Sequence, residues 1–198
     1  MVAHETIPNT GELNIEDYIT AINFLAESKS DFIFNNSKPE LAAIVMAAII
    51  NYSDDEIRIY DNCLNGDISN QHSSLLESIM HSLESGKKIK LALQKEIECK
   101  SEICKTLTRY QEEFPKGLDI RIANESFRKN IKDVLGKDIY FIVGDNDAYR
   151  METENVPNIR KGICSFNGPD ITKKLIKAFD KEFKNCLKYI PATSTVSA

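Results

Sequence analysis

The sequence contains no tryptophan, only three histidines and no long apolar run, and these absences exclude several classes of protein. A helix that spans a bilayer needs about 18 or more consecutive, mostly apolar residues. The most apolar stretch, Leu41 to Ile50, provides only about three helical turns. The first residues have neither the basic start nor the apolar segment of a secretory leader. We therefore expect a cytoplasmic protein that does not enter a membrane.

Common catalytic and metal-binding motifs are also missing. The sequence has no glycine-rich phosphate loop, no Gly-x-Ser-x-Gly elbow and no His-Glu-x-x-His zinc motif. Its five cysteines are odd in number and irregularly spaced, which indicates reduced thiols rather than a disulfide framework. His72 and His81 lie on one expected helix but project from opposite sides, so they cannot bind the same metal ion. No cofactor or metal is predicted. Both histidines are interpreted as surface or boundary residues, with a lone catalytic base as the alternative for His81.

The chain is acidic, with a formal net charge of −5 and a pI of about 5.3. Proteins that grip the phosphates of a duplex usually present a basic face. The acidic balance therefore disfavours broad nucleic-acid binding. Lysines do gather in the middle third and along the last expected helix, but acidic residues interleave with them. We interpret both groups as solvated faces, with a nucleic-acid or partner patch as the alternative.

Apolar residues alternate in several short segments, as in strands, and recur at helical spacing in the segments between them. Strands that alternate with helices predict an α/β domain with a mixed, mostly parallel sheet and helices on both faces. Ser37 is expected to cap the helix whose first turn contains Pro39. We expect helices at 15–28, 39–52, 69–85, 103–114, 127–135 and 170–189, and strands at 32–34, around 57–59, and at 89–93, 118–122, 139–143, 148–152 and 162–166.

Three sequence segments occur in an informative order. Phe34–Ser37 is followed by an alanine-rich helix and by the strand Ile57–Tyr60. Leu83–Lys90 combines the end of a helix, a glycine, basic residues and the start of a strand. Phe166–Pro169 precedes a helix that contains Phe179–Phe183. With the order of the elements, these segments resemble one repeat of the phospholipase D-like superfamily, over about residues 33 to 189 and with an extra N-terminal helix.

The resemblance implies chemistry carried by a His-x-Lys-x4-Asp motif, of which two copies face each other in tandem repeats or in a homodimer. The histidine attacks phosphorus and the lysine stabilises phosphate oxygens. Placed on the strand at 139–143, the motif matches at Asp145, whereas Asp138 and Tyr140 stand where the histidine and the lysine belong. In the later Gly-Ser-x-Asn element only Asn155 matches. No histidine follows His81, so the resemblance predicts a catalytically inactive copy.

Two further groups of polar residues are candidates for ligand or partner binding. Asp61 and Asn62 follow the first long strand, at the sheet edge where open α/β folds place their ligands. Asp147 and Glu152 belong to an acidic hairpin that also contains Asp145, and such carboxylates are ligands for Mg²⁺ or Ca²⁺. A solvated turn is the alternative interpretation of both groups.

These observations predict a protein-interaction or regulatory subunit that binds a protein partner and forms a homodimer. By the resemblance alone, it is expected in a bacterial defence or mobile-element system. Two alternatives stay open: a divergent metal-dependent nuclease or phosphodiesterase that uses the acidic hairpin, and a non-catalytic nucleic-acid-binding domain. We divide the chain into an N-terminal extension (1–30), a phospholipase D-like domain (31–190) and a flexible tail (191–198).

Overall fold

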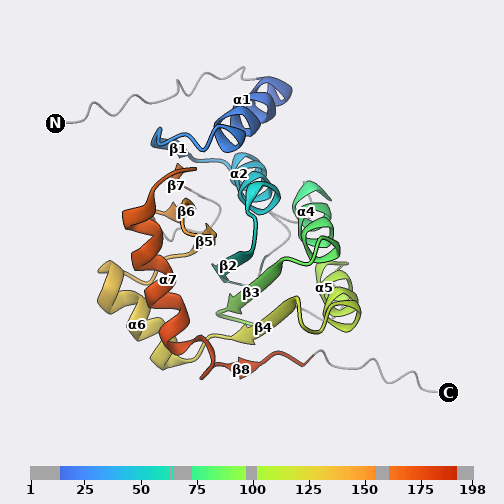
Figure 1. Ribbon diagram of the computed structural model, residues 1–198. Helices are drawn as coiled ribbons and strands as arrows, with labels where there is room; N and C mark the ends of the chain where they lie inside the picture. The colour runs from blue at the N-terminus through green and yellow to red at the C-terminus, as the bar shows by residue number, and fades with distance from the viewer. Residues whose placement is uncertain (1–13, 63, 65–72, 97–101, 155–160, 191–198) are drawn as a thin grey trace.

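The computed structural model describes residues 14–62, 64, 73–96, 102–154 and 161–190, which form a central sheet with helices on both sides (Figure 1). This part of the chain contains six helices and eight strands. In chain order the elements are α1 (Ile15–Glu27), β1 (Phe34–Asn36), α2 (Pro39–Tyr52), β2 (Glu56–Asp61), α4 (Ser73–Glu84), β3 (Lys88–Leu93), α5 (Glu102–Glu113), β4 (Leu118–Ile122), α6 (Glu125–Leu135), β5 (Phe141–Gly144), β6 (Ala148–Glu152), β7 (Gly162–Ser165), α7 (Pro169–Phe183) and β8 (Leu187–Lys188).

Helix α2 is apolar on every side and is buried from Ala42 to Ile50. A helix of this composition is stable only inside a protein, and α2 lies between the sheet, α1 and α4. Pro39 stands in its first turn, where the missing N–H removes no helical hydrogen bond. The predicted cap by Ser37 is wrong, because Lys38 occupies the N-cap position and forms no side-chain capping bond.

The strand order is β1-β7-β6-β5-β2-β3-β4-β8. Only the β2–β3 and β3–β4 pairs are parallel, whereas the five other neighbouring pairs are antiparallel. The prediction of a mostly parallel sheet is therefore wrong. The cause is the end of the strand–helix alternation at β5, which returns beside β2 in the opposite direction and starts the antiparallel run β5–β6–β7.

Both faces of the sheet are covered by helices, as predicted. Side chains alternate along β2, so that Ile57 and Ile59 join the core under α1, α2, α4 and α5. Tyr60 points to the opposite face, which α6 and α7 cover. There the Tyr60 and Phe127 rings lie edge to face at 5.2 Å, and Phe127 and Phe179 do so at 5.4 Å. This aromatic cluster packs α6 and α7 against the sheet around Tyr60.

The last helix is shorter than predicted. It ends at Phe183, and Leu187 and Lys188 instead form β8, which pairs with Ile122 and Arg121 of β4. The prediction extended it to residue 189 because apolar residues keep helical spacing through Leu187. The first strand also differs from the prediction, which places it at 32–34, because β1 spans Phe34–Asn36.

Helix α1 contributes Tyr18, Ile22 and Ala26 to the same core as α2. The predicted tail (191–198), the residues before 14 and the predicted helical residues 69–72 lie outside the described residues. Among the residues that the structure describes, no helix combines the length and the apolar character needed to cross a bilayer.

Candidate functional site

Polar side chains converge at one end of the central strands, where the carboxyl ends of the parallel strands β2 and β3 lie. We call this end of the strands the sheet edge. Tyr60 is next to last in β2, and Gln94 directly follows β3. Because β5 runs antiparallel to β2, with Phe141 opposite Tyr60, the residues before β5 reach the same edge. Asp138 and Tyr140 therefore lie beside Tyr60 and Gln94. This is the edge where open α/β sheets place their ligands.

Asp138 accepts hydrogen bonds from three side chains. The Tyr60 hydroxyl donates to Oδ1 (2.6 Å), while Gln94 Nε2 (3.1 Å) and Arg128 Nε (2.9 Å) donate to Oδ2. Gln94 Nε2 also approaches the Tyr60 hydroxyl at 2.6 Å, and the Tyr140 hydroxyl donates to Gln94 Oε1 (3.1 Å). We call these five residues the Asp138 cluster. They come from β2, the end of β3, α6 and the segment before β5, so only the complete fold assembles them.

The cluster is electrostatically balanced. The Asp138 carboxylate lies 2.9 Å from the guanidinium of Arg128, whose side chain is half exposed. Burial, together with the hydrogen bond to Asp138, raises the pKa of Tyr60 far above its ordinary value. The Tyr60 hydroxyl therefore stays protonated and acts as a donor. The cluster provides neither an uncompensated cation for a phosphate nor an activated nucleophile.

Asp145 lies at the other end of β5 from Asp138, so the structure does not bring these two motif positions together. Its carboxylate accepts hydrogen bonds from the backbone N–H groups of Asp54 (2.6 Å), Asp55 (3.0 Å) and Glu56 (3.1 Å). Asp145 thus holds the turn that leads from α2 into β2, which is a structural task. Asn155, the other matching position, lies outside the described residues.

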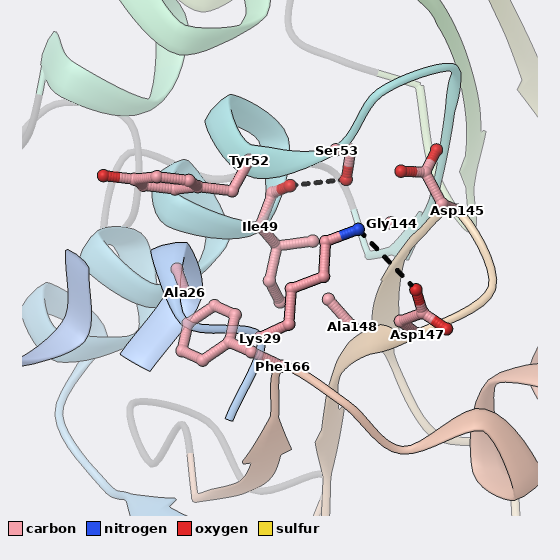
Figure 2. A pocket seen from close by; sticks show the side chains of 10 residues that line it. All are labelled: Ala26, Lys29, Ile49, Tyr52, Ser53, Gly144, Asp145, Asp147, Ala148 and Phe166. Carbon is pink, nitrogen blue, oxygen red and sulfur yellow. Dashed lines mark hydrogen bonds and ion pairs between the residues drawn. The ribbon is translucent and has the colours of Figure 1, made fainter. Parts of the chain in front are cut away.

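The acidic hairpin is divided between two places. Asp145 and Asp147 occupy the β5–β6 turn, whereas Glu152 lies at the far end of β6. Figure 2 shows the Lys29 side chain reaching toward Asp147, with 4.0 Å between the charged atoms. The cavity beside them has a volume of about 20 Å³, which is room for little more than a water molecule.

Glu152 is buried and faces Arg150 at 3.4 Å, and Arg150 Nε donates to Asn36 Oδ1 (3.3 Å). In the part of the chain that the structure describes, no three acidic, histidine or cysteine side chains gather into a metal-binding group. The described carboxylates of the hairpin do not meet in one place, because Asp145 and Asp147 lie at the β5–β6 turn and Glu152 lies at the far end of β6.

Asp61 and Asn62 reach the predicted sheet edge but do not join the Asp138 cluster. The side chain of Asp61 is buried and accepts a hydrogen bond from the N–H of Leu64 (3.1 Å). The backbone carbonyl of Asn62 accepts from the N–H of Lys95 (2.9 Å). Both residues shape the chain after β2. Sequence reasoning pointed to this end of the strands and missed Tyr60, whose side chain lies on the other face.

Histidines and cysteines add nothing to the described site. His81 is exposed on α4, and His72 lies outside the described residues. Cys164 and Cys186 are free and buried, and burial raises the pKa of Cys164 to about 12.

Similarity to known proteins is confined to structure, since neither a protein-family profile nor a curated protein sequence matches the chain. TrmBL2, an archaeal chromatin protein with a novel mode of DNA binding, superposes with a TM-score of 0.59 at 15% identity. That match covers 88% of this chain, which spans only 61% of TrmBL2. Nuc from Salmonella typhimurium, a phospholipase D family member, matches with a TM-score of 0.56 at 12% identity, covering 79% of this chain and 97% of Nuc. NucT from Helicobacter pylori gives the same TM-score and identity, with 79% and 99% coverage. The chain therefore has the phospholipase D-like fold that the sequence predicted.

Proposed function

We propose that this chain is a phospholipase D-like module without phosphodiesterase activity, which acts by binding another macromolecule. The Asp138 cluster carries the proposal. It fills the sheet edge at which the resemblance places the catalytic residues, and its members bond to one another.

The chemistry of the cluster opposes phosphodiester cleavage. A phosphodiester is an anion, and an attacking carboxylate at position 138 would bring two negative charges together. Asp138 also neutralises Arg128, the one cation of the cluster, so that a phosphate gains little from approaching it. Tyr140 has no charge and donates its hydroxyl hydrogen bond to Gln94. Removal of even one neutral hydrogen-bond donor that stabilises the transition state typically costs about 2.7–4 kcal/mol of barrier, and the uncharged Tyr140 stands where the family has a lysine.

The proposed role is that of an interaction or regulatory subunit. Members of the phospholipase D-like superfamily pair two copies of the domain, so a homodimer through the edge that carries the Asp138 cluster belongs to the proposal, together with a protein partner. The proposal also places the module in the cytoplasm, and a bacterial defence or mobile-element system is the setting that the resemblance suggests.

A direct test measures hydrolysis of bis-p-nitrophenyl phosphate and of plasmid DNA, with Mg²⁺, with Mn²⁺ and with a chelator. We expect the wild-type chain, Asp138→Asn and the control variant Asp133→Asn to be equally inactive. Hydrolysis by the wild-type chain that disappears in Asp138→Asn but persists in the control would overturn the proposal.

The paired state is tested by light scattering on the same protein. We expect the mass of a dimer for the wild-type chain. A monomer at every concentration would remove the homodimer from the proposal without restoring catalysis.

A further inference from the structure

Charge is unevenly distributed between the two helical layers. Residues 125–137 and 169–188, which contain α6 and α7, carry ten lysine and arginine residues against five acidic ones. The rest of the chain has fifteen basic and twenty-five acidic residues, so the net charge of −5 combines +5 on these two segments with −10 on the remaining sequence. Figure 1 shows α6 and α7 side by side on one side of the sheet.

The lysines of α7 and Lys184, its C-cap residue, share one side of the helix. Successive residues in a helix are rotated by about 100°, so positions 173, 174, 177, 181 and 184 fall within an arc of about 100°. All five are exposed, but Lys181 Nζ already donates a hydrogen bond to Asn130 Oδ1 (3.1 Å), which leaves Lys173, Lys174, Lys177 and Lys184. On the neighbouring helix, Lys129 and Lys132 are exposed as well. We call these six side chains the basic layer.

The acidic residues of α7 leave most of this charge uncompensated. Asp180 turns toward the sheet, where its carboxylate accepts hydrogen bonds from Arg58 Nη2 (2.8 Å) and Lys90 Nζ (3.4 Å). Glu182 accepts a hydrogen bond from the neutral amide of Asn185 (3.0 Å), so it keeps its charge and offsets one of these lysines. Asp170 lies in the first turn, where the helix dipole favours an acid. Among the described residues, no lysine of the basic layer forms an ion pair.

We propose that the basic layer binds the phosphate backbone of double-helical nucleic acid, without reading its sequence. The lysines from 173 to 184 extend along about 16 Å of rigid helix. A duplex carries one negative charge per about 1.7 Å of its axis, so it supplies a phosphate for each of them. Lysine acts as a point charge and contacts phosphates without selecting bases.

The apolar surface distinguishes a duplex from other polyanions. Among the described residues of 125–137 and 169–188, the exposed large apolar side chains are two separate ones, Val134 on α6 and Leu187 on β8. Binding of single strands relies on aromatic side chains that stack on bases, and none is exposed here. Insertion into a bilayer surface needs a continuous apolar helix face, which these helices turn toward the sheet instead. The proposal does not depend on the Asp138 cluster and holds whether or not that cluster is catalytically inactive.

The test uses fluorescence anisotropy of the full chain with a labelled random-sequence DNA duplex of about 20 base pairs, titrated between about 50 and 200 mM salt. The test variant is Lys173→Gln/Lys177→Gln/Lys184→Gln. The matched control is Lys38→Gln/Lys95→Gln/Lys116→Gln, which removes the same charge from exposed lysines outside the basic layer. Circular dichroism checks that both variants are folded.

Six phosphate contacts predict a slope of about −5 for log K against log salt concentration, and three predict about −3. We expect the wild-type chain and the control to show the steeper slope, and the test variant to bind at least about tenfold more weakly at low salt. Equal weakening of both variants would overturn the proposal, because general charge would then suffice. So would a slope that the test variant leaves unchanged, or tighter binding to single strands or to phosphatidylserine vesicles than to the duplex.

Discussion

Replacement of Asp138 by alanine should lower the free energy of unfolding by about 2–3 kcal/mol. Its carboxylate receives hydrogen bonds from Tyr60, Gln94 and Arg128. Hydrogen bonds to a charged group contribute about 1.5–3 kcal/mol each. The Arg128 contribution falls below this range because its side chain is half exposed and can return to water. Tyr60 and Gln94 still bond to each other, which limits the loss from their buried polar atoms.

Urea unfolding followed by circular dichroism measures this change, and for a domain of this size it corresponds to about 4–12 °C in melting temperature. Asp133→Ala on α6 is the control, because Asp133 is exposed and has no bonded partner among the described residues. We expect the control to stay within about 0.5 kcal/mol of the wild type. Asp138→Asn, which keeps one acceptor, should fall between the two.

Two results would refute the reasoning. If Asp138→Ala unfolds at the same urea concentration as the wild type, the three hydrogen bonds do not stabilise the fold. If it is more stable than the wild type, the cluster stores strain, as catalytic sites do, and a functional role for Asp138 replaces the structural one.

Three further predictions follow from other contacts. A Cβ on Gly144 would lie 2.9 Å from Ile49 Cγ2, so Gly144→Ala should cost about 1–3 kcal/mol in urea unfolding, and an unchanged midpoint would contradict this packing. Although burial opposes it, hydrogen bonding and charge from Arg58 lower the pKa of Asp180 in the folded chain. The Asp180 contribution is therefore present above the unfolded pKa of about 3.9 and is lost as pH falls through the lower folded value. Asp180→Asn should be less stable than the wild type at pH 7, and a difference that persists at the lowest pH would contradict this. Cys164, whose pKa burial raises to about 12, should react with a thiol reagent at pH 8 only after unfolding, and rapid labelling of Cys164 itself in the native protein, located by mass spectrometry of its peptide, would contradict its burial.

Sequence patterns predicted the elements well where local and tertiary preferences agree. The bounds of α2 follow from Pro39 at its start and from the polar residues that begin at Ser53. Sequence patterns fail where the structure of a segment is decided by pairing with a strand that is distant in sequence. Nothing between Phe183 and Tyr189 breaks a helix, yet the N–H of Tyr189 donates to the carbonyl of Ile120 and the chain becomes a strand. Helix propensity is a weak preference, and here the pairing of β8 with the outer side of β4 overrides it.

The site was predicted only in part for the same reason. Motif spacing identified Asp138 and Tyr140, which the structure places in one cluster. Their partners Tyr60, Gln94 and Arg128 come from elements far apart in sequence, and no local pattern links them. A usable indication existed for Gln94, a polar residue that directly follows a buried strand at the sheet edge where ligands bind.

The pairing of β1 has a consequence for folding during synthesis on the ribosome. β1 has one neighbour in the sheet, β7, and Phe34 lies opposite Cys164. During synthesis β1 therefore emerges long before its partner, followed by α2, whose apolar surface has no complete cover until β5 and β6 arrive. Contacts between such distant segments form slowly, and the waiting surfaces attract other chains. We expect the nascent chain to rely on a chaperone until β7 is released, and fragments that stop before β7 to aggregate.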